Sequence, residues 1–314
     1  MKSLNIVFAG TPAFAIPSLQ AIANSPHNLI GIYTQPDRPA GRGQQLQISA
    51  VKEWALAHNV PVHQPLNFKD QQAVQELSSS KPDLMIVIAY GLILPVSVLS
   101  IPRFGCINVH ASILPRWRGA SPIQHAILHG DTKSGVTIMQ LDAGMDTGDV
   151  LEIRECLLKG NETATVLHDQ LAELAIAPLL DTVNKIAAGQ ISAQAQDHQL
   201  ATYAPKILKE HAKIQWDKTA TEIEQQIRAF NPWPIAYTQT QDINLRIYKA
   251  KIADTTKSYT PGEIIEISKE GLLVATGSKG LLIEQLQFPG GKVITVNDWI
   301  NAGRKYLQVG MILE

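Results

Sequence analysis

The strongest constraint in this sequence is a run of seven residues, 83–89, in which every residue after the first is apolar. So short and apolar a run is typical of a strand that other layers cover on both faces, as in a parallel sheet. Helical patterns such as 50–58 and 69–77 separate it from further strand-like runs: 4–9, 29–34, 105–110 and 135–141. Strands that alternate with helices imply βαβ units, so we expect an N-terminal α/β domain with a Rossmann-like, mostly parallel sheet.

The pattern of predicted helices and strands changes in the last third of the chain. A long helical pattern over 162–188 ends at Gly189, and the residues that follow are rich in Ala and Gln and poor in bulky apolar residues. A helix over 220–229 then precedes short strands separated by Gly, Pro, Asp and Ser: 243–251, 262–267, 272–276 and 281–288. This spacing is typical of a small barrel such as an OB-fold. The predicted organisation is a first domain over 1–189, a linker over 190–208 and an OB-like β-barrel domain over 209–314.

Composition excludes several classes of protein. No run approaches the roughly 20 apolar residues that a membrane span requires, and the first residues lack the apolar core of a signal peptide. Two cysteines, Cys106 and Cys156, are too few for a disulfide framework. We therefore expect a cytoplasmic protein without a membrane segment. A net charge of −1 argues against a general nucleic-acid binder but permits a local basic patch.

The residues best placed for chemistry lie at the end of the fourth strand, 105–110, and in the loops after it. Because side chains alternate along a strand, Asn108 and His110 point to one side near its carboxyl end, where open α/β sheets bind ligands. A loop with two arginines and a tryptophan follows, and the glycine-containing loop 141–149 supplies Asp146, which could orient His110 and stabilise its charged form. A lone histidine at a strand end is usually structural, and an Asp-Gly run is usually a turn. Their combination favours a functional site.

Around these residues the chain resembles the folate-dependent formyltransferases. The signature is Asn108-x-His110-x-Ser112-x-Leu114-Pro115, followed by Arg118-Gly119 and by Asp142-x-Gly144-x-Asp146-Thr147-Gly148. Three further segments resemble the methionyl-tRNA formyltransferase branch: 8–12, 34–43 and 228–234. Ala111 and Ile113 stand where glycine and leucine are common, and both changes are conservative. The resemblance extends from residue 4 to the C-terminal strands.

The resemblance implies an activity and a set of site residues. The reaction would move the formyl group of 10-formyltetrahydrofolate to the α-amine of methionine on initiator methionyl-tRNA, for the initiation of translation. Asn108, His110 and Asp146 would be catalytic, without a metal. The folate would lie against Ser112, Ile113, Leu114 and Pro115, with strand 85–89 and loop 90–92 as the pterin wall. Arg38 and Arg42 would contact tRNA, and the protein would be a monomer.

Four questions stay open at this point. Gly10 is not followed by the other glycines of G-x-G-x-x-G, so a bound dinucleotide would need another site. Cys106 shares the face of Asn108 and His110, so it is either a nucleophile for a formyl thioester or a buried structural thiol. The acceptor could instead be a sugar amine, a glycinamide nucleotide or water. A non-catalytic RNA-binding protein could also keep the fold, but the intact catalytic residues argue against it.

Overall fold

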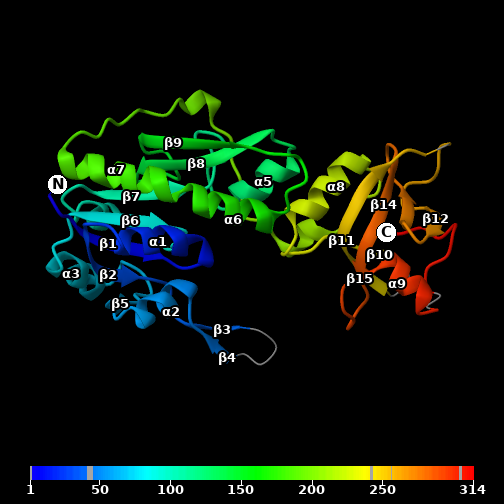
Figure 1. Cartoon of the computed structure of the whole chain (residues 1–314), viewed down its shortest axis with the longest axis horizontal. Coiled ribbons are helices and arrows are strands. Elements are labelled where there is room, and N and C mark those ends of the chain that lie inside the picture. The colour runs from blue at the N-terminus through cyan, green and yellow to red at the C-terminus, as the bar shows by residue number, and fades with distance from the viewer. Residues whose placement is uncertain (1, 41–44, 241–242, 256, 304–305) are drawn as a thin grey trace. The chain divides into compact units, whose positions relative to one another are not determined.

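A computed structural model describes residues 2–40, 45–240, 243–255, 257–303 and 306–314 (Figure 1). The chain forms two compact units. Unit 1 comprises 1–122, 133–157 and 168–204, and unit 2 comprises 123–132, 158–167 and 205–314. In the described part of the chain, no helix is both long enough and apolar enough to cross a membrane.

Unit 1 is built on a seven-stranded sheet. Its strands, in spatial order, are β5 (Val62–His63), β2 (Asn28–Tyr33), β1 (Asn5–Gly10), β6 (Leu84–Ile88), β7 (Cys106–His110), β8 (Lys133–Gln140) and β9 (Val150–Leu157). The strands from β5 to β7 are parallel, whereas β8 and β9 are antiparallel to their neighbours. This arrangement confirms the predicted mostly parallel α/β domain.

Helices cover both faces of this sheet. On one face, strand residues such as Val7 and Met85 pack with Leu77 of α3 (Gln71–Ser79) and Val98 of α4 (Val96–Leu99). On the other face, α1 (Ile16–Ala23) contacts β2, and α7 (Ile176–Ala188) contacts β8, β9 and α1. The remaining helices of the first 174 residues are η1 (Ala13–Ala15), α2 (Ala50–Ala57), α5 (Pro122–Leu128) and α6 (Ala164–Leu174).

The predicted continuous helix over 162–188 is in fact two helices, α6 and α7, separated at Ala175. Pro178 lies in the first turn of α7 and has no N–H to donate to the carbonyl of Leu174, so the ladder of hydrogen bonds is interrupted there. The predicted end at Gly189 is confirmed, because this glycine has a φ of 67° and caps the helix in the left-handed conformation.

The strand order reverses between β1 and β6, because the chain builds β2 and β5 on one side of β1 and then β6 and β7 on the other. Ligands of such sheets bind beyond the carboxyl ends of the strands at this point. The loops there are tied together: the Thr11 hydroxyl donates to the carbonyl of Tyr90 (2.9 Å), and the Gln35 amide donates to the carbonyl of Gly91 (2.8 Å).

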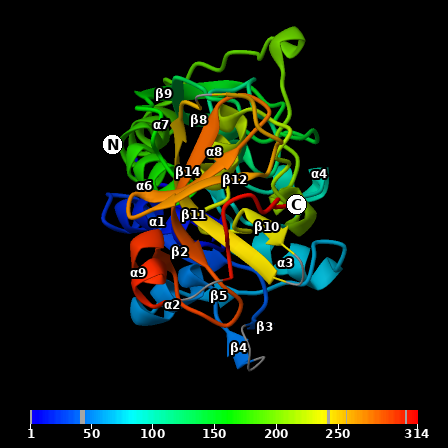
Figure 2. The same cartoon turned by 90° about the vertical axis from the view of Figure 1, so that its right-hand side faces the viewer.

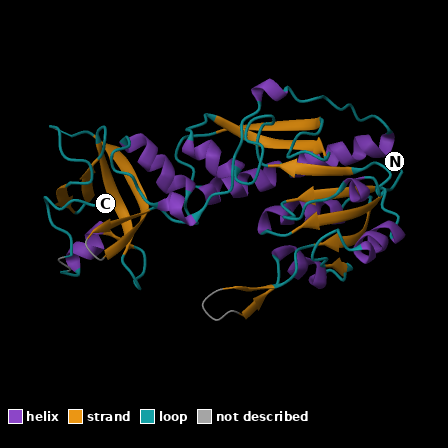
Figure 3. Cartoon of the chain, turned by 180° about the vertical axis from the view of Figure 1, so that it is seen from behind, coloured by secondary structure: helices purple, strands orange, loops and turns teal. Residues whose placement is uncertain are grey.

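A separate hairpin, β3 (Arg38–Ala40) paired with β4 (Gln45–Gln47), stands away from the large sheet of unit 1 (Figure 3). Its base is held at Asp37, which forms an ion pair with Lys52 and accepts a hydrogen bond from the Gln64 amide. The hydrogen bond from Lys52 lowers the pKa of the Asp37 carboxyl, which keeps this carboxylate charged.

Unit 2 contains an antiparallel sheet with the order β10 (Tyr237–Thr240), β11 (Ile243–Ala253), β14 (Gly280–Gln287), β13 (Gly271–Ala275) and β12 (Ile264–Ser268), with β15 (Ile294–Thr295) beside β14. Helix α8 (Ala220–Ala229) packs on β11 and β14 (Figure 2), and α9 (Val296–Asn301) packs on β13 and β14. The other elements are η2 (His198–Leu200), which belongs to unit 1, and η3 (Lys209–Ala212). Among the described residues the sheet is an open half-barrel, so the predicted β domain is confirmed.

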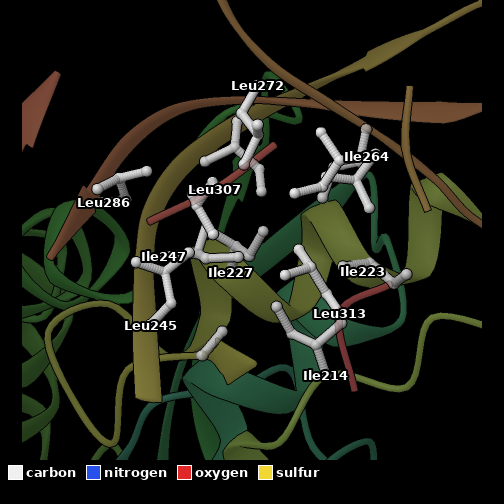
Figure 4. Packing of buried hydrophobic residues seen from close by; sticks show 14 of the residues in the cluster. Ile214, Ile223, Ile227, Leu245, Ile247, Ile264, Leu272, Leu286, Leu307 and Leu313 are labelled. Carbon is white, nitrogen blue, oxygen red and sulfur yellow. The ribbon is translucent and has the colours of Figure 1, made fainter. Parts of the chain in front are cut away.

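The core of unit 2 lies between α8 and the sheet (Figure 4). Ile223 and Ile227 of α8 meet Leu245 and Ile247 of β11, and all four are almost inaccessible to solvent. Because Leu245 and Ile247 are two residues apart, the residues between and beside them point away from this core.

Candidate active site

His110 is buried at the carboxyl end of β7. Its Nε2 lies 2.8 Å from the carbonyl oxygen of Trp117. A carbonyl oxygen only accepts hydrogen bonds, so Nε2 carries a proton and donates it to this oxygen. The other ring nitrogen, Nδ1, lies 3.6 Å from Oδ2 of Asp146. The structure therefore brings two of the predicted residues together, with Nδ1 as the nitrogen that can gain or lose a proton.

Asp146 is held in place by two hydrogen bonds. Its Oδ2 accepts one from the backbone N–H of Gly119 (2.7 Å), and its carbonyl accepts one from the side-chain amide of Gln196 (2.9 Å). The residue has a φ of 55°, a conformation that asparagine and aspartate adopt more readily than most residues. Only glycine fits at position 148 of this loop, because a Cβ there would lie 1.8 Å from the carbonyl oxygen of Gln140. The carboxylate is thus fixed beside His110.

Asn108 lies one alternation before His110 on the same face of β7 and is half-buried. Its strand neighbours in register are Val87 and Met139. Within the described part of the chain, no protein group hydrogen-bonds to its side-chain amide. Half-buried amides usually have hydrogen-bond partners. An amide without a protein partner can therefore donate to a bound ligand.

The loop after β7 contains the four residues expected to line a folate site. Ser112 and Leu114 are buried and serve the loop itself: the Ser112 hydroxyl donates to the carbonyl of Arg116 (2.6 Å), and the Leu114 N–H donates to the Thr137 hydroxyl (3.1 Å). Ile113 and Pro115 are half-buried. Of the four, these last two present the more accessible side chains.

Two residues outside the predicted set support this centre. Arg118 is only 2% exposed, and its Nε and Nη2 atoms donate to Oε1 of Gln196 (3.1 and 2.7 Å). Gln196 in turn donates to the carbonyls of Asp146 and Gly148. Sequence reasoning missed Gln196, because it lies in a segment whose composition is typical of a linker. No local pattern marks it.

Cys106 occupies the same face as Asn108, as predicted, but is completely buried. It packs in the core cluster with Met85, Val87 and Val98. Burial raises the pKa of its thiol to about 12, so the thiolate that a nucleophile requires is scarce near neutral pH. These observations favour the structural alternative for Cys106.

The expected tRNA contacts are Arg38 and Arg42, and the structure describes the first of these. Arg38 is exposed on β3, and it has no carboxylate partner among the described residues. Asp37, the acidic residue beside it, is engaged by Lys52 instead. Arg42 lies outside the described residues. No group of three or more His, Cys, Asp or Glu side chains suited to a metal occurs in the part of the chain that the structure describes.

Comparisons with known proteins extend these observations. The formyl transferase family model matches residues 1–183, and the model of the formyl transferase C-terminal domain matches residues 206–304. The methionyl-tRNA formyltransferase of Legionella pneumophila strain Philadelphia 1 is 57% identical over 314 residues, which cover 100% of both chains. The chain belongs to the methionyl-tRNA formyltransferase family. This finding confirms the membership that the motifs predicted.

Solved structures of more distant proteins share the formyltransferase fold. The N-formyltransferase from Helicobacter canadensis, solved with folinic acid and dTDP-3-aminofucose, has a TM-score of 0.68 and 20% identity and covers 89% of this chain and 99% of its own. HypX from Aquifex aeolicus, solved with tetrahydrofolic acid, has a TM-score of 0.67 and 15% identity. The alignment covers 98% of this chain but 48% of HypX. At these identities the likeness establishes the fold alone.

The role of Gln196 in this formyltransferase leads to a stability prediction. Gln196→Ala removes the oxygen that accepts from Nε and Nη2 of the buried Arg118 guanidinium and leaves His198 Nδ1 beside Nη2. Hydrogen bonds to charged groups contribute roughly 1.5–3 kcal/mol. We expect the free energy of unfolding to fall by about 2 kcal/mol, measured by urea denaturation. Gln194→Ala, an exposed neighbour, should change it by less than about 0.5 kcal/mol. Equal effects of the two variants would contradict this role.

A second prediction concerns the thiol of Cys106. Because burial raises its pKa to about 12, the group stays protonated at pH 8 and its thiolate appears only as the pH approaches that value. Iodoacetamide at pH 8 should therefore leave Cys106 unmodified in the folded protein and alkylate it in 8 M urea, as read by peptide mass spectrometry. Rapid alkylation in the folded protein would mean that this thiol is accessible and ionised.

Proposed function

We propose that this protein transfers the formyl group of 10-formyltetrahydrofolate to the α-amine of methionine on initiator methionyl-tRNA. One observation carries the proposal: the Asn108 amide, which has no hydrogen-bond partner among the described residues, shares the face of β7 with His110, beside Asp146. The full-length likeness to a methionyl-tRNA formyltransferase supports the choice of acceptor. We also propose that residues 1–189 catalyse the reaction and that 209–314 help to bind tRNA. Monomeric state and cytoplasmic location remain predictions.

Asn108 provides the electrostatic part of the mechanism. A free α-amine has a pKa near 8, so a useful fraction is neutral at pH 7 and can attack the formyl carbon directly. The attack places negative charge on the formyl oxygen. The Asn108 amide N–H donates a hydrogen bond to that oxygen, and a single donor of this kind contributes about 3 kcal/mol to the transition state.

His110 moves the protons. The Trp117 carbonyl retains the proton on Nε2, so Nδ1 accepts the proton that the attacking amine loses. The ring is then positively charged, and the Asp146 carboxylate 3.6 Å from Nδ1 stabilises that charge. His110 next returns the proton to N10 of the folate as the bond between N10 and the formyl carbon breaks. No formyl thioester is needed, which agrees with the burial of Cys106.

The folate lies against the loop 112–115 in this proposal. Ile113 and Pro115 contact it, and Ser112 and Leu114 hold the loop in shape through their hydrogen bonds. Strand residues 85–89 and loop 90–92 form the pterin wall, and this loop accepts hydrogen bonds from Thr11 after β1 and from Gln35 after β2. Support comes from HypX and the Helicobacter canadensis enzyme, which share the fold and were solved with folates.

The direct test is formyl transfer by the purified protein from 10-formyltetrahydrofolate. Charged initiator tRNA should be formylated, whereas uncharged tRNA and a free amino sugar should not. Preferential formylation of the amino sugar would assign the protein to the same chemistry on a different acceptor. Absence of transfer to all three acceptors, with a correctly folded protein, would exclude the proposed reaction.

The catalytic residues lead to a kinetic prediction. Asn108→Ala removes the donor to the formyl oxygen and His110→Ala removes the proton carrier, so each should lower kcat on the order of a hundredfold or more. Single-turnover assays with saturating tRNA would measure this loss. Asn161→Ala, an exposed asparagine elsewhere, is the matched control and should retain full activity. A near-normal kcat in either active-site variant would remove that residue from the mechanism.

The arginines of the hairpin segment lead to a prediction about tRNA. Arg38→Ala and Arg42→Ala should lower kcat/KM for charged initiator tRNA while folate binding and stability stay unchanged. Phosphate contacts release counterions and strengthen as salt falls, so if Arg38 or Arg42 meets phosphate the loss should be larger at low ionic strength. If Arg42 touches bases, its variant should also discriminate less between initiator and elongator acceptor stems. An unchanged kcat/KM for both variants at two salt concentrations would exclude these arginines from recognition.

A further inference from the structure

Trp233 is unlike the other tryptophans of this chain. Trp54, Trp117, Trp216 and Trp299 are buried, whereas Trp233 is 48% exposed. It lies in the segment 228–234 that marks the family resemblance, yet the proposed chemistry does not use it. An exposed indole exposes a large apolar surface to water, so a ligand that covers it gains binding energy.

The surface beside Trp233 is a shaped groove within unit 2. Residues of β11 alternate: Leu245 and Ile247 enter the core, and Arg246 and Tyr248 lie on the opposite face. Tyr237 of β10 is directly opposite Arg246 in register and therefore shares that face. Together with Trp233 these side chains line a hollow of about 580 Å³. Small-ligand sites have volumes of roughly 300–1,000 Å³.

The charges of this groove favour an anion. Arg246 and Lys209 line it, and neither has a carboxylate partner among the residues that the structure describes. One carboxylate, Glu210, lines it as well, so the two cations leave a net positive charge. A flat aromatic surface beside unpaired cations is how proteins bind single-stranded nucleic acid: bases stack on the ring and phosphates meet the cations.

We propose that this groove binds an unpaired nucleotide of the tRNA substrate, with the base stacked on Trp233 and the phosphate held by Arg246 and Lys209. The inference rests on the proposed function, because it assigns part of the tRNA to a surface of unit 2. Stacking discriminates unpaired from paired bases, since a base within a duplex has no free face. The groove therefore senses a single-stranded stretch of RNA.

The exposure of a single tryptophan makes the test specific. Iodide quenches exposed indoles, so in the wild-type protein it reports mainly on Trp233. Three probes are compared: uncharged initiator tRNA, a non-pairing hexaribonucleotide, and the same hexamer annealed to its complement. The tRNA and the single-stranded hexamer should change the Trp233 emission and protect it from iodide, and the duplex should not. A duplex that acts as strongly as the single strand would overturn the stacking proposal.

Variants separate stacking from charge. Trp233→Ala should weaken binding of the single-stranded hexamer on the order of tenfold, and Trp233→Phe, which keeps a ring, should restore most of it. Arg246→Gln should weaken binding and reduce its salt dependence by about one counterion. Lys269→Gln, which neutralises a cation outside the groove, is the matched control and should leave affinity and salt dependence nearly unchanged.

Two failures are distinguishable, because binding of the hexamer needs neither folate nor an aminoacyl group. If Trp233→Ala binds RNA and formylates tRNA as well as the wild type, this inference is wrong and the proposed function stands. If no acceptor is formylated but the Trp233 signal persists with single-stranded RNA, the reaction is wrong and the groove still binds RNA. Concentration-dependent quenching without RNA would assign the surface to a second copy of the chain and overturn the proposal.

Discussion

The site depends on the hydrogen bonds that satisfy one buried guanidinium. A buried positive charge is costly unless its donors are bonded, and Gln196 accepts from two donor atoms of Arg118. The amide nitrogen of the same glutamine donates to the carbonyls of Asp146 and Gly148. Backbone bonds from Arg118 to Thr202 and from Ala204 to Arg118 hold the segment that carries Gln196. Residues from distant parts of the chain thus determine where the Asp146 carboxylate lies.

Features with a local periodic cause were predictable from the sequence. The apolar runs gave the parallel strands, and alternation placed Asn108 and His110 on one face. Asp146 was predicted from a glycine-containing loop and a family motif, and the structure places its carboxylate beside His110. Strand β9 was missed because the edge strand carries charged residues, which interrupt the apolar pattern while protecting the edge from pairing. The break between α6 and α7 was overlooked because the pattern of apolar residues continues through Pro178.

Features that depend on distant partners left no local signal. Gln196 is 78 residues from Arg118 in the chain, and its neighbours have the composition of a linker. The burial of the Cys106 side chain could not be predicted either, since alternation specifies the face of the strand but not the exposure to solvent. Burial then decided between the two alternatives, because a desolvated thiol stays protonated. The grouping of 123–132 and 158–167 with unit 2 likewise follows from contacts that no periodicity encodes.

In the reaction that we propose, an amide and an imidazole suffice, and the arrangement around His110 supports this. The acceptor amine is already partly neutral at physiological pH, so the protein need not generate a strong nucleophile. It must stabilise charge on the formyl oxygen and move one proton between two nitrogens. The Trp117 carbonyl accepts from Nε2, so in the proposed mechanism Nδ1 exchanges the proton, and Asp146, 3.6 Å from Nδ1, stabilises the protonated ring. Because both neighbours are held by hydrogen bonds within the protein, the centre is organised before the substrates arrive. Hydrogen-bond donors and charges stabilise a transition state most under this condition.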